Sequence, residues 1–551
     1  MRIAVEGCTH GELDKIYSTV QELETKQGYK IDLLLCCGDF QSTRNLTDLK
    51  CMACPDKYKD MCSFYRYYSG EKLAPVLTVF IGGNHEASNY LQELAYGGWV
   101  APNIYYLGYA GVINVNGVRI GGMSGIYKGF DYLFGHFEKP PYDDNTMRSC
   151  YHIRNVDVFR LKQLASNPPH IMLSHDWPRS VTNYGNTDQL MRFKKHFKDE
   201  IEQDKLGSPP TKEVLDVLKP EYWFSAHLHC KFAALVEHED GSATKFLALD
   251  KCLPGRRFLQ VVELGEPVGE NDEIVLRYDK TWLAVLKSTN HLTSVERKTR
   301  YTPGPGSNER FDFQPTEAEI REIKELFKDD FEIPFNFEQS ALAFKPTGAR
   351  INMSQVKQPE ATVNRQTTEL CKKLGILDPM ALLVGSPKRC TPGVPAMYLR
   401  NYVNEKETNL SMNSTFNPDE ISLNEDEEID DDDVDDVLVE TVEEKTSDSS
   451  VPRTPISLPV PQLDNDDVDL VAVLDSTDKS SLETVLDSSD KSSLDTSQDN
   501  IFFIDKNPNE TDSEKSADFT KPDPPRTRPD DPPVKKLKRR NASLYSAEDQ
   551  D

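Results

Sequence analysis

The sequence predicts a layered α/β fold, in which short buried strands alternate with helices. Short apolar runs recur along the first half of the chain and run into glycine or into polar residues, as at Val76–Phe80. A helical three-to-four spacing of apolar residues separates the first two of these runs. Asn116-Gly117 and Asp240-Gly241 each lie between apolar runs and mark two hairpins. Together these features predict strands, covering helices and polar strand ends.

Composition separates the chain into two parts. The 551 residues carry a net charge of −27, but residues 401–551 hold 40 acidic and 15 basic side chains, which leaves the first 400 residues near neutrality. A polyanionic substrate is therefore compatible with the front half. The eleven cysteines include the adjacent pair Cys36-Cys37 in an apolar run, which indicates reduced thiols.

We expect a soluble protein of the cytosol or nucleus. The chain shows no secretory signal at its N-terminus, which enters a strand at once. No apolar run approaches the roughly 18 residues that a membrane span needs, so no membrane association is expected.

The first strands end in chemistry-bearing residues. Residues 1–6 form a β-prone run that ends in Gly7-Cys8-Thr9-His10, and Glu12–Lys26 has the spacing of a covering helix. The second strand, Ile31–Cys37, stops at Gly38-Asp39. The third runs into Ile81-Gly82-Gly83-Asn84-His85-Glu86, which places an amide and an imidazole at the carboxyl edge of the sheet.

Two irregular stretches interrupt the pattern. Cys51, Cys54 and Cys62 could be three ligands of a zinc site, but a fourth nearby ligand is absent, which favours a structural interpretation. Residues 126–154 form a long loop-like insertion in which aromatic residues alternate with cations. Such a composition suits unpaired nucleotides, although a self-packed surface loop is the alternative.

The second half of the sheet system repeats the pattern of strand-end residues. Ile171–Leu173 leads to His175, and Tyr222–Ser225 leads to His227 and His229. Residues 1–264 would thus form one catalytic domain. Residues 265–350 are expected to form an accessory C-terminal domain, and residues 351–551 a mostly disordered acidic tail.

The tail carries one basic motif. Residues 535–540 read Lys-Lys-Leu-Lys-Arg-Arg, which fits a nuclear localisation signal or a nucleic-acid contact. We therefore expect a nuclear protein, with shuttling to the cytoplasm as a second expectation. The acidic part could recruit spliceosome-associated or RNA-turnover proteins, although a charge run is more often solvated chain.

The strand-end residues together form a metal-binding pattern. Any one of these histidines is more often structural, but five clusters in this chain order are hard to explain that way. The chain resembles the calcineurin-like metallophosphoesterases, whose order is Asp-x-His, Gly-Asp, Gly-Asn-His-Glu, a lone His and Gly-His-x-His. Cys8 stands where most of that superfamily has Asp, and Ala226 where it usually has Gly. With the 126–154 insertion and the C-terminal domain, the cysteine points to the RNA lariat debranching enzymes.

The resemblance implies an α/β metallophosphoesterase β-sandwich with flanking helices and two divalent metal ions. It implies that Cys8, His10, Asp39 and His229 hold one ion. Asp39, Asn84, His175 and His227 would hold the other, with Asp39 as the bridge. His85 would stabilise or protonate the leaving oxygen. Because a thiolate is a softer donor than a carboxylate, we expect Fe2+, Zn2+ or Mn2+ to support activity better than Mg2+.

The implied function is hydrolysis of the 2′-5′ phosphodiester at the branch point of excised intron lariats, which linearises them. The branched intron lariat RNA would be read by the insertion. The expected contacts are Tyr127, Lys128, Tyr132, Arg148, His152 and Arg154. The alternatives are another calcineurin-like phosphoesterase, either a protein phosphatase or a nuclease, and a non-catalytic scaffold.

Overall fold

The computed structural model describes residues 1–269, 272–346 and 353–385, all of which lie in one compact unit. The acidic tail and its basic motif at 535–540 lie outside the described residues. Within the described part, no helix is both long enough and apolar enough to cross a membrane.

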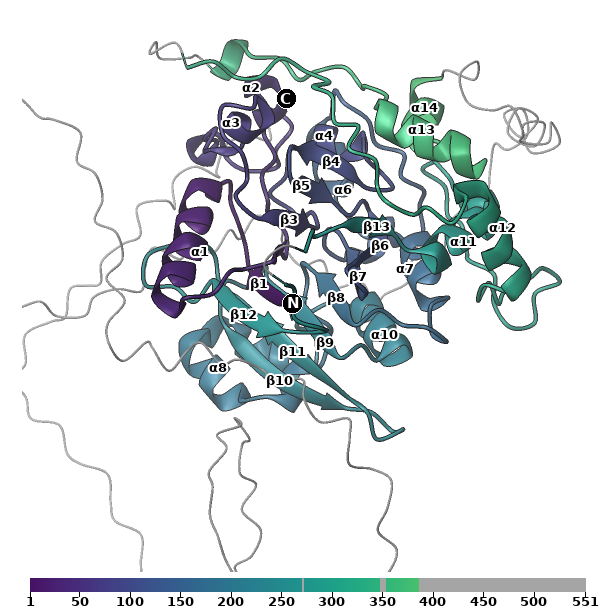
Figure 1. Cartoon of the computed structure of the whole chain (residues 1–551), viewed down its shortest axis with the longest axis horizontal. Coiled ribbons are helices and arrows are strands. Elements are labelled where there is room, and N and C mark those ends of the chain that lie inside the picture. Colours follow the sequence, from purple (N-terminus) through teal and green to yellow (C-terminus); the bar gives the residue numbers. More distant parts are fainter. Residues whose placement is uncertain (270–271, 347–352, 386–551) are drawn as a thin grey trace, which may run out of the picture. The chain divides into compact units, whose positions relative to one another are not determined.

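The first sheet has six strands in the order β12-β1-β2-β3-β5-β4 (Figure 1). Its four central strands, β1, β2, β3 and β5, are parallel, and β12 and β4 pair antiparallel at the edges. The strand bounds are β1 Arg2–Glu6, β2 Leu33–Cys36, β3 Leu77–Phe80, β4 Gly98–Ala101, β5 Ile104–Tyr106 and β12 Leu259–Glu263.

The second sheet has seven strands in the order β10-β11-β9-β8-β7-β6-β13. Strands β11, β9, β8 and β7 are parallel, and the predicted hairpins β6–β7 and β10–β11 are both present. The strand bounds are β6 Ala110–Val115, β7 Val118–Met123, β8 Ile171–Ser174, β9 Tyr222–Ser225, β10 Phe232–Glu237, β11 Ala243–Ala248 and β13 Leu276–Tyr278.

The two sheets pack face to face, which confirms the predicted β-sandwich. Alternate residues of one strand face opposite sides: Leu33 and Leu35 lie in the core between the sheets, whereas Leu34 lies in the outer core beneath α1. On the other sheet, Leu173 points inward and Met172 joins the outer core. The central strands, such as β2 and β8, are therefore buried on both faces, which explains why they are apolar runs rather than alternating ones. Strands β10 and β11 at the edge of the second sheet instead alternate between buried and more exposed residues.

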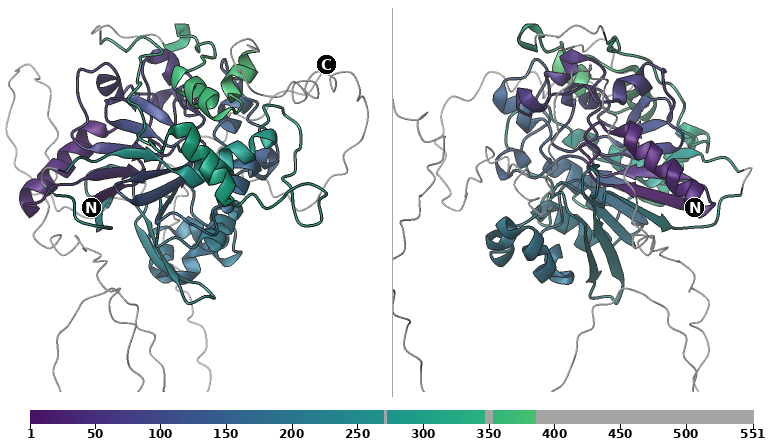
Figure 2. Two further views of the ribbon diagram at one scale, coloured as in Figure 1. Left: turned by 45° about the vertical axis from the view of Figure 1, so that its right-hand side comes forward. Right: turned by 90° about the vertical axis from the view of Figure 1, so that its left-hand side faces the viewer.

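Helices cover the outer faces (Figure 2). The predicted helix over 12–26 is α1, which ends at Gly28 in the left-handed conformation that glycine adopts at helix ends. The α-helices are α1 Leu13–Gln27, α2 Leu46–Leu49, α3 Phe64–Tyr68, α4 Ser88–Gln92, α5 Gly129–Tyr132, α6 Asp144–Ser149, α7 Asn155–Lys162, α8 Thr187–Phe193, α9 Lys198–Glu202, α10 Pro209–Leu218, α11 Lys280–Ser288, α12 Glu317–Phe327, α13 Arg365–Leu374 and α14 Pro379–Val384. The 3₁₀ turns are η1 Asp56–Tyr58, η2 Val181–Tyr184, η3 Lys195–Phe197, η4 Asn290–Leu292 and η5 Met353–Gln355.

The segment expected to be an accessory domain joins the main fold. Strand β13 pairs with β6, and α11 lies beside α12 (Figure 1). Side chains of α11, α12 and α13 share one apolar core with those of α7 and α10. Helices α13 and α14 lie in the range expected to be mostly disordered. They form because a short amphipathic face, which includes the fully buried Leu374, completes that core.

Candidate metal centre

The carboxyl ends of the parallel strands bring the candidate ligands together. Cys8 and His10 follow β1, Asp39 follows β2, and Asn84 and His85 follow β3. From the second sheet, His175 follows β8, and His227 and His229 follow β9. Parallel strands deliver such residues to one edge of each sheet, and the sandwich sets the two edges against each other.

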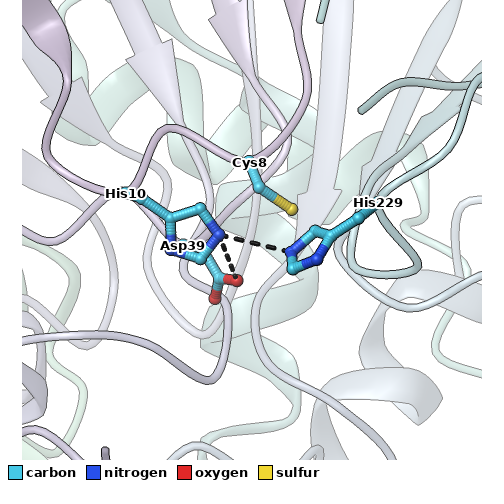
Figure 3. A group of neighbouring side chains, drawn as sticks. All are labelled: Cys8, His10, Asp39 and His229. Atoms are coloured by element: carbon cyan, nitrogen blue, oxygen red, sulfur yellow. Dashed lines mark hydrogen bonds and ion pairs between the residues drawn. The ribbon is translucent and has the colours of Figure 1, made fainter. Parts of the chain in front are cut away.

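The first group is formed by Cys8, His10, Asp39 and His229 (Figure 3). One ligand atom from each lies within 4.8 Å of all the others. The Nε2 atoms of His10 and His229 are 3.3 Å apart, and His10 Nε2 lies 3.7 Å from Asp39 Oδ2. Because ligand atoms about 2.0–2.3 Å from one ion lie close to each other, these four donors fit a single divalent cation.

The second group is formed around His175. Its Nε2 lies 3.1 Å from Asp39 Oδ1 and 3.2 Å from Asn84 Oδ1, and its ring centroid is 4.9 Å from that of His227. The two carboxylate oxygens of Asp39 therefore face different groups. This is the arrangement that a bridging ligand requires.

The state of Asp39 fits a cation. Its Oδ2 is buried and accepts no hydrogen bond within the described residues, a costly condition for a charged oxygen without a counter-ion. Burial alone would raise the pKa of Asp39, but the neighbouring His175 and His85 outweigh it and hold that pKa well below its usual range. The carboxylate is therefore ionised and able to bind metal.

Two of the imidazoles and the thiol also suit this role. Burial lowers the pKa of His10 to about 3 and that of His227 well below its ordinary value, so both rings are neutral ligands. Burial and the nearby Asp39 raise the pKa of Cys8. Its sulfur accepts a hydrogen bond of 3.1 Å from the His227 backbone N–H, and a cation would supply the positive charge that a thiolate needs.

The backbone is strained where the ligands are presented. His10, Asp39, His227 and His229 all have positive φ angles, between 44° and 67°. Such conformations are costly for residues with a side chain and occur mostly at functional sites. They turn each strand end sharply enough for its side chain to point into the centre.

Two residues support the ligands from behind. Glu86 accepts hydrogen bonds from the backbone N–H groups of Phe40, Gln41 and Gly83, and so ties the Asp39 turn to the Asn84 turn. Burial raises the pKa of Glu86 to about 8. The His175 Nδ1–H group donates a hydrogen bond of 2.8 Å to the Cys37 carbonyl oxygen, which leaves Nε2 to face the centre.

Glu86 was not among the predicted site residues, although it is the last residue of the Gly-Asn-His-Glu motif. Buried Glu6, which accepts a 2.6 Å hydrogen bond from the Thr9 hydroxyl, gave no signal beyond its place at the end of a strand.

His85 lies beside the first group. Its backbone N–H donates to Asp39 Oδ1 at 2.8 Å, and its ring centroid is 5.4 Å from that of His10. The side chain is half-buried. It is thus anchored through its backbone, and its imidazole lies near the ligands of the first group without belonging to either set.

The predicted RNA contacts divide into two kinds. Tyr127, Lys128, Tyr132 and Arg148 are half-buried on the insertion, which contains α5 and α6 rather than only loop. His152 is buried against Asp131 at 2.7 Å. Arg154 is fully buried, with its guanidinium 2.7 Å from Glu138. These last two side chains therefore have partners inside the fold and little exposed surface, and their contact with RNA stays a prediction.

The group of candidate metal ligands does not include Cys51, Cys54 or Cys62. Cys51 packs with Tyr142 and Cys150 in a small apolar cluster. The Sγ of Cys62 accepts a hydrogen bond of 3.6 Å from Gln41. For these two residues the geometry is that of packing.

Comparison with known proteins identifies two matching family descriptions. Residues 1–231 match "Calcineurin-like phosphoesterase", and residues 241–379 match "Lariat debranching enzyme, C-terminal domain". Three similar proteins carry the name lariat debranching enzyme. The Drosophila melanogaster protein is 44% identical over 100% of both chains. The Homo sapiens protein is 50% identical over 78% of this chain and 80% of its own. The Xenopus laevis protein, lariat debranching enzyme A, is 49% identical over 82% of this chain and 86% of its own.

Proposed function

Because this chain belongs to the lariat debranching enzyme family, we propose that it hydrolyses the 2′-5′ phosphodiester at the branch point of excised intron lariats. The observation that carries the proposal is the double ligand set around Asp39, whose two oxygens face His10 and His175. Such a pair of adjacent cation sites suits a phosphodiester, which carries negative charge through the whole reaction.

The residues have distinct parts in the reaction. Two divalent cations held by these donors would neutralise the phosphodiester and lower the pKa of the attacking water. His85 is not a metal ligand in either set and would protonate the departing 2′ oxygen. Asp39 contributes one carboxylate oxygen to each ligand group and so sets the spacing between them. Glu86 fixes the turns that carry Asp39 and Asn84.

We propose that the two ions are Fe2+, Zn2+ or Mn2+ rather than Mg2+. Cys8 offers a thiolate to one site, and soft sulfur favours Zn and Fe over Mg, which prefers oxygen. The second site offers the two imidazole nitrogens of His175 and His227, the amide oxygen of Asn84 and the bridging Asp39 carboxylate, and imidazole suits Zn and Fe. Metal analysis of protein purified without oxygen tests the assignment.

The insertion is proposed to read the branch through Tyr127, Lys128, Tyr132 and Arg148. The Tyr127 and Tyr132 rings meet edge to face at 5.4 Å, and the Tyr127 backbone N–H donates to Asp176, the residue after His175, at 3.3 Å. This contact joins the insertion to a ligand-bearing turn, which supports a role next to the scissile bond.

Two further proposals concern the tail. Its basic motif at 535–540 would direct the protein to the nucleus, with shuttling to the cytoplasm, and the net charge of −25 over residues 401–551 would recruit basic partners among spliceosome-associated or RNA-turnover proteins. Deleting residues 535–540 should abolish nuclear accumulation of the tagged full chain; unchanged accumulation would refute the targeting role.

A substrate panel tests the function. Purified protein should linearise lariat RNA and leave linear RNA, DNA and a phosphoprotein intact. Asn84→Ala should lose activity together with metal, whereas His85→Ala should lose activity and keep its metal. Equal turnover of the phosphoprotein or of DNA would favour another calcineurin-like activity, and no turnover of any substrate would favour a scaffold.

A further inference from the structure

We infer that residues 297–301 join the insertion to form a binding surface for one unpaired arm of the branched RNA. We call this the Arg297 surface, and it consists of Phe130, Phe137, Arg297, Lys298 and Tyr301. The inference rests on the proposed function and extends it to a part of the chain in which the sequence showed no chemistry.

The backbone holds the two segments side by side. The N–H groups of Gly135 and His136 donate to the carbonyl oxygens of Glu296 and Ser294 at 3.0 and 3.1 Å, and the Arg300 N–H donates to the Leu133 carbonyl oxygen at 2.8 Å. A Cβ at Gly135 would lie 2.4 Å from the Ser294 carbonyl oxygen, so this close approach requires glycine. The surface is therefore fixed by main-chain contacts rather than by chance proximity of side chains.

Aromatic rings and cations meet on the outside of this junction. Phe130 is 62% exposed and Tyr301 79% exposed, values that are high for large rings. The Arg297 guanidinium lies 5.9 Å from the Phe130 ring centroid and 5.5 Å from that of Phe137, yet Arg297 and Lys298 remain exposed. Exposed rings next to a guanidinium can stack bases while the cations meet phosphates.

The carboxylates around the surface are largely occupied. Glu296 pairs with Arg300 at 2.7 Å, and Asp131 pairs with the buried His152 at 2.7 Å. Asp143 caps α6 by accepting a hydrogen bond from the Thr146 backbone N–H. Arg297 lies over the Phe130 and Phe137 rings, and its charge also acts on Asp131 and Asp143, each of which has the partner named above. A polyanion is therefore a better occupant than an acidic peptide.

The insertion connects this surface to the metal centre. Its first residues are tied to the turn after His175 through the Tyr127–Asp176 hydrogen bond, and its middle is tied to residues 294–300. The Ile153 N–H donates to the Ile126 carbonyl oxygen at 2.9 Å and closes the base of the insertion. An RNA strand that leaves the branch along the insertion would therefore meet the Arg297 surface next.

The test compares charge, stacking and control variants of the full chain. The variants are Arg297→Gln with Lys298→Gln, Phe130→Ala alone, and the control pair Arg321→Gln with Lys324→Gln on α12. Binding of a branched RNA with long single-stranded arms is measured against salt concentration in a His85→Ala background. KM and kcat are measured in the otherwise native chain, for the long-armed RNA and for a minimal branched trinucleotide.

The charge pair should lower the slope of log affinity against log salt by about 1.4, which is about 0.7 for each lost phosphate contact on a single strand. KM for the long-armed RNA should rise roughly tenfold, while kcat and the trinucleotide parameters stay within about twofold. Phe130→Ala should weaken binding about fivefold or more with an unchanged slope. The control pair should behave as the native chain.

An unchanged slope in the charge pair would overturn the inference, including the case in which the surface binds a protein instead. Equal losses on the trinucleotide would also overturn it, because they would mean damage to the centre itself. Failure of the proposed function is distinct: it would show as no cleavage by the native chain, whatever the slope.

Discussion

Gly83→Ala should disable the enzyme although it adds only one methyl group. The new Cβ would lie 2.2 Å from Asp39 Oδ1 and 2.7 Å from His175 Nε2. Ordinary contacts need about 3.4 Å, so the bridging carboxylate or the Gly83 turn must move by about 1 Å. Both are held by Glu86, which bonds the backbone of each turn, and neither can move alone. A misplacement of about 1 Å typically costs about 100-fold in rate.

The neighbouring Gly82→Ala is the matched control. Its Cβ would meet the Leu91 side chain at 3.1 Å, and would lie at ordinary contact distance from Ser124 at 3.6 Å and from the Glu86 Cγ at 3.7 Å. A leucine methyl can shift by a few tenths of an ångström. We expect kcat on branched RNA to fall about 100-fold or more for Gly83→Ala, with fewer metal ions per chain, and to fall less than about threefold for Gly82→Ala. Equal activity in the two variants would refute the argument that the Asp39 bridge has no room to move.

Three more outcomes follow from the structure. Cys8→Asp would replace the sulfur ligand by an oxygen ligand and should raise activity with Mg2+ relative to activity with Zn2+ or Fe2+. Full activity of the native chain in a Mg2+-only, metal-scrubbed preparation would contradict the argument that the Cys8 sulfur disfavours Mg2+. Arg154→Ala leaves Glu138 buried without its cationic partner and should lower the free energy of unfolding by about 3–5 kcal/mol. In the same urea denaturation assay, the control Arg148→Ala should change that free energy by less than about 1 kcal/mol. A similarly small loss for Arg154→Ala would mean that the buried ion pair is not needed for stability. Leu374→Ala, in the core shared with α11 and α12, should lower the free energy of unfolding by about 2–5 kcal/mol. A loss as small as that of the exposed Val384→Ala would show that α13 contributes little to the stability of the fold.

The metal centre could be predicted because its residues follow strands that are easy to recognise. Apolar runs stop at Cys8, Asp39, Asn84, His175 and His227, and the parallel order of the strands forces their ends to one edge. Local spacing was therefore sufficient to place these residues at strand ends, and the Asn-Gly and Asp-Gly turns were sufficient for both hairpins. The sandwich and the division of the ligands into two sets came from the resemblance to the calcineurin-like metallophosphoesterases.

The insertion was harder to predict, because residue type does not tell which way a side chain points. Arg154 and His152 look like RNA-binding cations in the sequence, but each finds a carboxylate that the fold brings inside. Gly135 of the insertion pairs with Glu296, which is 161 residues further along the chain, and only this backbone pairing reveals that the two segments are neighbours. Helix α13 was missed because its stability comes from packing rather than from its own composition.

The most direct test of the account is the product of a single turnover on a synthetic branched RNA that carries both a 2′-5′ and a 3′-5′ link at one adenosine. The native chain should cleave only the 2′-5′ link, leaving a 2′ hydroxyl on the branch nucleotide and a phosphate on the released 5′ end. His85→Ala, with its metal content unchanged, should yield no product. Cleavage of the 3′-5′ link, or full turnover by His85→Ala, would contradict the proposed function.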